Sequence, residues 1–257
     1  MPKYFQTLEE MEASPVPVVC HATDYPAGSS TGQHHHPFHH QLIHAVDGVM
    51  VVIAEAGQWI VPPTRGIWMP AGTVHLVRYV GEVRMRSLFV RPHAAKGLPI
   101  EAQVVGISPL LRELIRAAAA VDKCYDSDSR DGRLMRFLLD ELHALPVLPM
   151  HLPSPSDSRL QRICSHIQQQ PDDNTTLAAW ADQLAVDPKT LQRLFARDTG
   201  MGFARWRQQA RLLKALELLA QGDKVIDVAL ALGYESPGAF ATMFKRQFGQ
   251  TPSGFFR

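Results

Sequence analysis

The chain has 257 residues, of which 46% are hydrophobic and 20% charged, and its formal net charge at pH 7 is +1. This size suits one large or two modest domains, and this composition excludes collagen-like, disordered and disulfide-scaffold chains. No apolar run approaches the roughly 20 residues that a membrane-spanning helix needs. The start of the chain lacks a secretory pattern, and its three cysteines are odd in number and far apart. The sequence therefore predicts a cytoplasmic protein with no membrane partner.

Short β-branched runs separated by turn residues fill roughly residues 15–92. The runs lie at 49–53, 58–61, 66–69, 75–79 and 85–90, and the separating residues include Gly48, Gly57, Pro62-Pro63, Gly72 and Gly81. Many short strands at this spacing are typical of a barrel or sandwich. We therefore expect residues 1–106 to form a β-barrel.

Helical periodicity replaces this pattern over residues 107–145. Ser108 and Pro109 predict an N-cap and the first helical position. A later apolar stripe recurs at helical spacing and consists of Leu134, Phe137, Leu138, Leu142 and Leu145. Such a stripe either packs on the chain's own barrel or forms an interface, here called the seam, with a second copy. Its residues are therefore candidates for dimerisation. Four prolines then predict an extended linker at 146–156.

The third part, 157–257, is helical almost throughout and contains two similar helix-turn-helix patterns. The first, at about 174–197, has Thr176 as a cap candidate and restarts at Asp187-Pro188; the second, at about 223–248, restarts at Ser236-Pro237. A helix expected over 203–220, about 27 Å long, separates them. Two such units on a rigid spacer suit successive major-groove segments of double-stranded DNA, roughly 34 Å apart.

Basic residues concentrate in this part of the chain. Residues 189–214 contain seven Lys or Arg residues against one acid, Asp198. A basic stripe of this kind fits a polyanion partner, although a solvated helix face gives the same pattern.

The third part resembles the AraC/XylS family of transcription regulators. The resemblance rests on Ala178-x-x-Ala181-x-x-Leu184, Leu191-x-x-Leu194-Phe195, Thr199-Gly200-Met201-Gly202-Phe203, Ala231-Leu232-Gly233-Tyr234-x-Ser236 and Phe240-x-x-x-Phe244-Lys245-x-x-Phe248-Gly249-x-Thr251-Pro252-Ser253. It implies a DNA-binding regulator that is usually a homodimer and often answers a small molecule through an N-terminal domain. The expected DNA partner is a promoter or operator with half-sites, and activation would require a contact with RNA polymerase.

The resemblance also implies where DNA is contacted. The expected positions are Lys189, Thr190, Gln192, Arg193 and Arg197 in the first unit, and Pro237, Gly238, Ala239, Thr242, Lys245 and Arg246 in the second. Lys and Arg pair with guanine and Gln pairs with adenine, whereas proline, glycine and alanine bring little hydrogen bonding. We therefore expect the first unit to discriminate bases, and the second to contribute phosphate contacts or weak readout.

Histidines cluster in the first part: eight of the 12 lie between positions 21 and 75. The candidates for an effector or metal site are His34, His36, His39, His40, Gln41 and His75. On one strand, His34 and His36 share a face, and imidazole suits zinc, nickel and iron(II). The run from Pro70 to His75 is similar to the second cupin motif, which implies a cupin-type sensor; Gln41, however, stands near the position where cupins usually have a glutamate. The histidines therefore line an organic effector pocket, bind a divalent metal, or form an incidental polar loop.

Together these observations predict an α+β two-domain protein: a cupin-like barrel with a helical dimerisation segment, and a C-terminal all-α domain with two helix-turn-helix units. The function we expect is transcription regulation, in answer to a small molecule or metal. The alternatives are a regulator without a ligand and a histidine-metal cupin enzyme fused to a DNA-binding domain. An enzyme is disfavoured, because the sequence has no nucleophile elbow and no phosphate-binding glycine loop.

Overall fold

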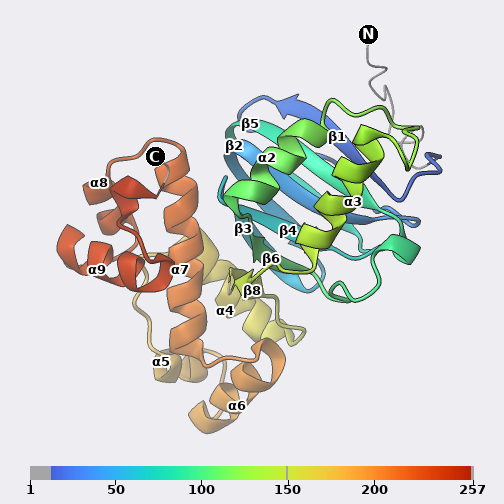
Figure 1. Ribbon diagram of the computed structural model, residues 1–257. Helices are drawn as coiled ribbons and strands as arrows, with labels where there is room; N and C mark the ends of the chain where they lie inside the picture. Colours follow the sequence, from blue (N-terminus) through green and yellow to red (C-terminus); the bar gives the residue numbers. More distant parts are fainter. Residues whose placement is uncertain (1–12, 149, 256–257) are drawn as a thin grey trace. The chain divides into compact units, whose positions relative to one another are not determined.

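The computed structural model describes residues 13–148 and 150–255, and these form two compact units (Figure 1). The first unit contains the described residues up to Ala54 together with Trp59–His151, and the second contains Glu55–Gln58 and the residues from Leu152 onward. Residues 1–12, on which the expectation about a secretory signal falls, and Pro149 of the predicted linker lie outside the described residues. Among the described residues, none of the helices combines the length and the hydrophobicity that a membrane-spanning segment requires.

The described residues contain one sheet of eight strands, most of which belongs to the first unit. The strands are β1 (Val18–Tyr25), β2 (His40–Ala54), β3 (Gly57–Val61), β4 (Arg65–Met69), β5 (His75–Val90), β6 (Gln103–Gly106), β7 (Val147–Leu148) and β8 (His151–Pro153). Their order is β1-β5-β2-β4-β6-β7, and β3 pairs with β2 and β8. The region is therefore rich in sheet, as its short β-branched runs predict.

Two glycines that the sequence suggests as turns instead lie inside long strands. Gly48 is in β2 and Gly81 is in β5, both with positive φ. The strand register shifts between Asp47↔Arg84 and Val49↔Val80, which marks a bulge. A Cβ at Gly48 would lie 2.3 Å from the Glu82 carbonyl oxygen, so only glycine fits. The expected separation into shorter strands is wrong here, because positive φ bends the pair without ending it.

Two helices cover one face of this sheet (Figure 1). They are α2 (Pro109–Ala118) and α3 (Arg130–Leu142), capped by the side chains of Ser108 and Ser129, and a short 3-10 helix, η1 (Pro92–Ala94), precedes them. Leu138 and Leu142 are buried in the core of this same unit. These two leucines therefore pack within one chain and are unavailable to a seam between chains; Leu134 and Leu145 are partly buried against the same core, and Phe137 is exposed.

The segment predicted as an extended linker is partly built into the sheet. Strands β7 and β8 both lie within it, and Met150 and Leu152 are buried. The prolines do favour extended backbone, and Met150 and Leu152 between them supply buried apolar side chains, whereas Val147 is exposed.

The second unit is helical. Its helices are α4 (Ser158–Gln169), α5 (Leu177–Gln183), α6 (Pro188–Thr199), α7 (Phe203–Ala220), α8 (Val225–Ala231) and α9 (Pro237–Phe248), followed by a 3-10 helix, η2 (Pro252–Gly254). The predicted starts are confirmed: Asp187 accepts from the Thr190 N–H at 3.0 Å and Ser236 from the Ala239 N–H at 3.1 Å. The two helix-turn-helix units are thus α5–α6 and α8–α9.

Candidate functional site

Helix α6 has one buried and one polar face. Leu191 and Phe195 are fully buried, and the Phe195 ring meets the Trp206 ring edge-on at 6.2 Å. The opposite face carries the side chains predicted to contact DNA: Lys189, Gln192, Arg193 and Arg197 are exposed, and Thr190 is half-buried. Burial of the apolar stripe thus turns the basic and amide groups outward together.

Helix α9 follows the same plan with different chemistry. Phe240, Met243 and Phe244 are buried. The outward set is Gly238, Ala239, Thr242, Lys245 and Arg246, with Pro237 half-buried. The beginning of this face lacks charge and long side chains, whereas the end is basic.

Part of the basic stripe serves the fold instead of the surface. Arg207 Nη1 donates to the Thr175 carbonyl at 3.0 Å, and Arg211 donates to the Pro171 and Asp173 carbonyls at 2.6 and 3.0 Å. Burial lowers the pKa of Arg211. These two arginines therefore hold the loop between α4 and α5, which corrects the interpretation of the whole stripe as a surface for a polyanion.

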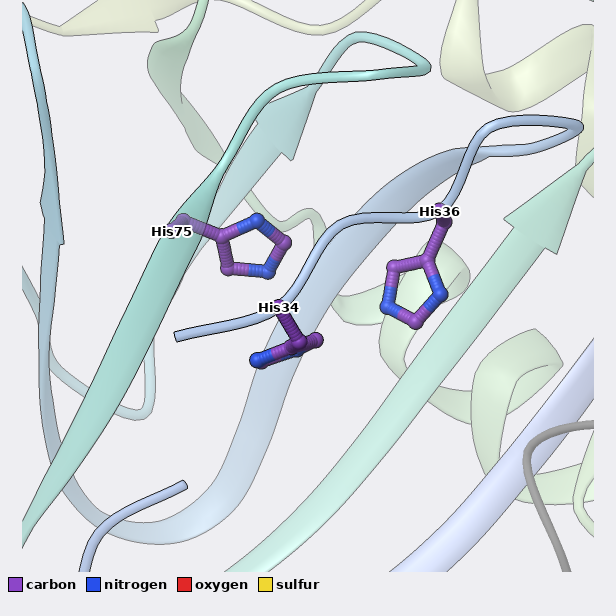
Figure 2. A group of neighbouring side chains, drawn as sticks. All are labelled: His34, His36 and His75. Carbon is purple, nitrogen blue, oxygen red and sulfur yellow. The ribbon is translucent and has the colours of Figure 1, made fainter. Parts of the chain in front are cut away.

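Three of the predicted histidines meet at one place in the first unit (Figure 2). His34 and His75 form an isolated antiparallel bridge, and His36 follows on the same segment. The Gly72 N–H donates to the His36 carbonyl at 2.9 Å, which ties the turn before β5 to this segment. Potential ligand nitrogens of the three rings lie within 4.8 Å of one another.

Hydrogen bonds to the backbone orient two of these rings. His34 Nδ1 lies 2.9 Å from the Gly32 carbonyl oxygen, and His75 Nδ1 lies 2.8 Å from that of Thr73. A carbonyl only accepts, so each Nδ1 carries the proton and each Nε2 presents a lone pair. Burial lowers the pKa of His75 to about 4, and burial with neighbouring His34 does the same for His36. The His36 and His75 rings are therefore neutral at pH 7, the form that binds metal.

The other predicted members of this cluster lie elsewhere. His40 Nδ1 accepts from the Ala71 N–H at 3.2 Å, and its ring stacks on Trp68 at 5.3 Å. His39 is buried, with its ring 6.4 Å from that of Phe89. His39 and His40, both candidates from the sequence, therefore lie outside the group formed by His34, His36 and His75. His40 is the first residue of β2, and its ring is turned toward Trp68.

A buried polar pair adjoins the three histidines through Phe89. The Phe89 ring meets the His36 ring edge-on at 4.9 Å, and Phe89 is the register partner of Gln41. Gln41 Oε1 and Ser87 Oγ are buried and have no hydrogen-bond partner among the described residues. Ser87 lies two residues before Phe89 and so shares its face. Sequence reasoning missed Ser87, because nothing local distinguishes it from an ordinary strand serine.

Several known proteins are similar to this chain, over its C-terminal part or over most of its length. Residues 180–257 match a family of helix-turn-helix domains. The chain is 36% identical over 215 residues to the HTH-type transcriptional regulator NimR of Escherichia coli, covering 84% of this chain and 78% of NimR. It is 32% identical over 103 residues to the HTH-type transcriptional regulator RipA of Corynebacterium glutamicum, covering 40% of this chain and 31% of RipA. A crystal structure of fatty-acid-bound ToxT from Vibrio cholerae aligns over 93% of this chain and 94% of its own at 10% identity, with a TM-score of 0.39.

The two helix-turn-helix units and these relatives define a DNA-binding transcriptional regulator. The chain belongs to the AraC/XylS family of such regulators, since the match to NimR spans most of both proteins. The resemblance found from the sequence is confirmed, and double-stranded DNA is the partner that the helix-turn-helix domain implies.

Proposed function

We propose that the first unit of this regulator senses a divalent transition metal ion at His34, His36 and His75, and that the bound ion changes how the second unit binds DNA. The observation that carries the proposal is the set of three rings with converging nitrogens, two of them held through Nδ1 by backbone carbonyls. Metal-binding histidines usually have such a second hydrogen bond. The relatives are regulators, which supports sensing rather than catalysis.

The donor chemistry suits zinc, nickel or iron(II). Three neutral imidazoles are typical ligands of these ions and leave a coordination position for water or an effector. When bound, the ion supplies a positive charge that joins three side chains from two segments. His34 and His36 come from the chain before β2, whereas His75 begins β5. Their simultaneous binding restrains these segments, and an ion that favours one conformation shifts the population toward it.

In the second unit we propose that α6 discriminates bases and α9 contributes phosphate contacts and weak readout. Arg193 and Gln192 are exposed and have side chains able to pair with base edges. The exposed Ala239 and Thr242 have short side chains suited to a thymine methyl, whereas Lys245 and Arg246 suit phosphates. The expected target is a promoter or operator with two half-sites, where an activating regulator would also contact RNA polymerase.

Homodimerisation is the third part of the proposal. The outward faces of α2 and α3 retain two large apolar side chains, Leu110 and Phe137, which are 47% and 45% exposed. We therefore propose a dimer interface formed by Leu110, Phe137 and the partly buried Leu134. It no longer includes Leu138 and Leu142, which the core of the unit buries. Large exposed apolar side chains on the two helices that cover the sheet favour association with a second copy.

A second candidate for the sensed molecule is a small organic effector. The orphaned polar atoms of Gln41 and Ser87 favour it, because buried hydrogen-bonding groups normally have partners. A ligand with one hydrogen-bond donor facing each oxygen would satisfy both groups, with or without a metal at the histidines.

The experiment that tests the metal proposal is elemental mass spectrometry of untagged protein purified without chelating resin. We expect about one transition metal ion per chain, lost in His75→Ala. The matched control is His35→Ala: the exposed His35 lies between two of the ligands and outside the cluster, so this variant should keep the metal. Protein that stays metal-free after incubation with nickel, zinc and iron(II) would overturn the proposal and direct the search to organic effectors by thermal shift.

A further inference from the structure

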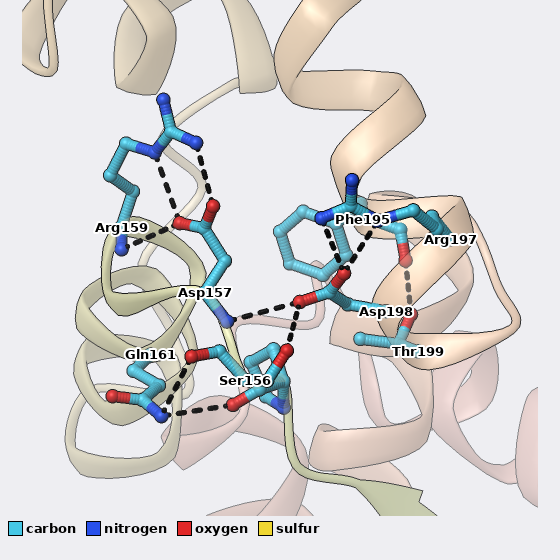
Figure 3. A network of polar contacts seen from close by, with 9 residues as sticks. Ser156, Asp157, Arg159, Gln161, Phe195, Arg197, Asp198 and Thr199 are labelled. Carbon is cyan, nitrogen blue, oxygen red and sulfur yellow. Dashed lines mark hydrogen bonds and ion pairs between the residues drawn. The ribbon is translucent and has the colours of Figure 1, made fainter.

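Asp198 connects the end of α6 to the segment that leads into α4 (Figure 3). Its Oδ2 accepts from the Ser156 hydroxyl at 2.9 Å and from the Asp157 N–H at 3.0 Å. Its Oδ1 accepts from Arg197 Nε at 3.0 Å, and Arg197 Nη2 lies at the same distance. The Asp198 side chain is only 4% exposed, so water does not replace these partners freely.

The segment that Asp198 holds is itself fixed to the helices of the second unit. Trp206 Nε1, on α7, donates to the Pro153 carbonyl at 2.9 Å, and Gln161 Nε2, on α4, donates to that of Pro155 at 3.1 Å. Asp157 caps α4 by accepting from the Arg159 N–H at 2.9 Å. Residues 153–157 therefore form a rigid support against which the last turn of α6 is held.

This support acts on the helix that we propose reads DNA bases. Asp198 lies five residues after Arg193, about 7.5 Å along the helix at ~1.5 Å per residue. Apolar packing through Phe195 fixes the depth of α6, since that ring is fully buried. Apolar contacts are non-directional, whereas the hydrogen bonds of a carboxylate have preferred directions and lengths. The Asp198 bonds therefore fix the rotation and tilt of α6 more sharply than its apolar face does.

We infer that Asp198 is a positioning residue for DNA reading, which holds α6 at the orientation that base contacts require and holds Arg197 beside it. Asp198 itself touches no DNA; it acts through the 156–157 backbone and through Arg197. The inference rests on the proposed reading role of α6. A base contact is lost after a smaller displacement of the helix than a phosphate contact is, because bidentate pairing with a base edge depends on angle as well as distance.

The test compares specific with non-specific DNA binding by the full chain. The specific probe is a duplex selected from a random library by the wild-type protein, and the non-specific probe is a scrambled duplex of the same composition. Asp198→Asn keeps the shape but replaces an acceptor of charge-assisted bonds with an amide. We expect specific affinity to fall about tenfold. Non-specific affinity should stay equal or rise, since one negative charge is removed from a basic surface.

Two further variants make the outcome decisive. Asp182→Asn removes one exposed negative charge from the same helix-turn-helix unit, and should leave the ratio of specific to non-specific affinity unchanged. Ser156→Ala removes one bond to Asp198 without changing charge, and should lower the ratio about threefold. It also carries the test if Asp198→Asn does not fold.

The inference is overturned if Asp198→Asn, or Ser156→Ala in its place, binds both probes like wild type or loses affinity equally for both. Arg193→Ala is measured beside these variants to separate two failures. If Arg193→Ala does not relax base preference, the reading role of α6 fails. If it does and the ratio for Asp198→Asn is unchanged, only the positioning role fails.

Discussion

His34 and His75 face each other across an antiparallel bridge, and the backbone N–H of each donates to the carbonyl of the other at 2.9 Å. Their ring centroids are 4.4 Å apart. Each ring is also held through Nδ1 by the carbonyl two residues earlier in its own segment. The pair is thus fixed by backbone and side-chain bonds together, so ligand nitrogens are positioned before any ion arrives. Such preorganisation lowers the cost of binding.

Gly48→Ala should strongly destabilise the first unit. The residue has φ 80°, and its new Cβ would lie 2.3 Å from the Glu82 carbonyl oxygen. Both backbone strain and a steric clash with backbone oppose the substitution. We expect a loss of about 3 kcal/mol or more in the free energy of unfolding, measured by urea denaturation.

Gly28→Ala is the control for that measurement. Gly28 has a similar φ of 74°, but a Cβ there meets nothing within 4 Å. It should cost about 1–2 kcal/mol, the penalty of a left-handed backbone alone. Equal losses for the two variants would show that the bulge at Gly48 does not depend on close approach to β5.

One thiol should react rapidly in the folded protein. Burial raises the pKa of Cys20 to about 12 and also raises that of Cys164, so both are protonated at pH 8. Cys124 is exposed. Because the thiolate is the reactive form, a disulfide reagent should titrate one thiol per chain rapidly in native protein and three after unfolding. Rapid reaction of a second thiol would mean that the core around Cys20 or the core around Cys164 opens in the folded protein.

Features that depend on neighbouring residues could be predicted from the sequence. The caps at Asp187 and Ser236, each followed by proline, mark the starts of α6 and α9 because capping is decided within one turn. The spacing of His34 and His36, with His75 after a turn motif, predicts the group that the structure brings together, whereas the metal stays a prediction.

Features that depend on residues far apart in the chain could not be predicted from the sequence. As glycines between apolar runs, Gly48 and Gly81 suggest turns in the sequence. Only the pairing of β2 with β5 makes them part of a bulge. The roles of Arg207 and Arg211 depend on carbonyls more than 30 residues earlier in the chain. The direction of the His40 ring depends on where β2 begins. The exact ends of strands are the part of a fold that sequence predicts least well.

Arg193→Ala and Arg246→Ala should weaken DNA binding in different ways. If Arg193 reads a base, its loss costs about 1–3 kcal/mol and relaxes preference at one position of the site. If Arg246 contacts phosphate, its loss weakens binding equally across sequences and lowers the salt slope by about 1. Competition assays with single-base variants of the selected duplex, repeated at several salt concentrations, separate the two. A uniform loss for Arg193→Ala would count against base reading by α6.

Phe137→Asp should convert a dimer to a folded monomer. Its ring is 45% exposed on α3. A charged side chain there would be hydrated in the monomer but buried without a partner in an apolar dimer interface. We expect dimer dissociation to increase about tenfold or more, measured by light scattering across a dilution series. Leu138→Asp is the contrast, because that side chain is fully buried and the variant should unfold. A Phe137→Asp protein that stays dimeric at every dilution places the seam elsewhere.

One titration decides whether metal at the three histidines changes DNA binding. The affinity of the full chain for the selected duplex is measured by fluorescence anisotropy with metal-free protein and with protein loaded with the ion it retains. We predict that the two affinities differ about tenfold, within the usual range of allosteric coupling. The difference should vanish in His75→Ala and persist in His35→Ala. Equal affinities for metal-free and metal-loaded wild-type protein would show that metal at these histidines does not change DNA binding.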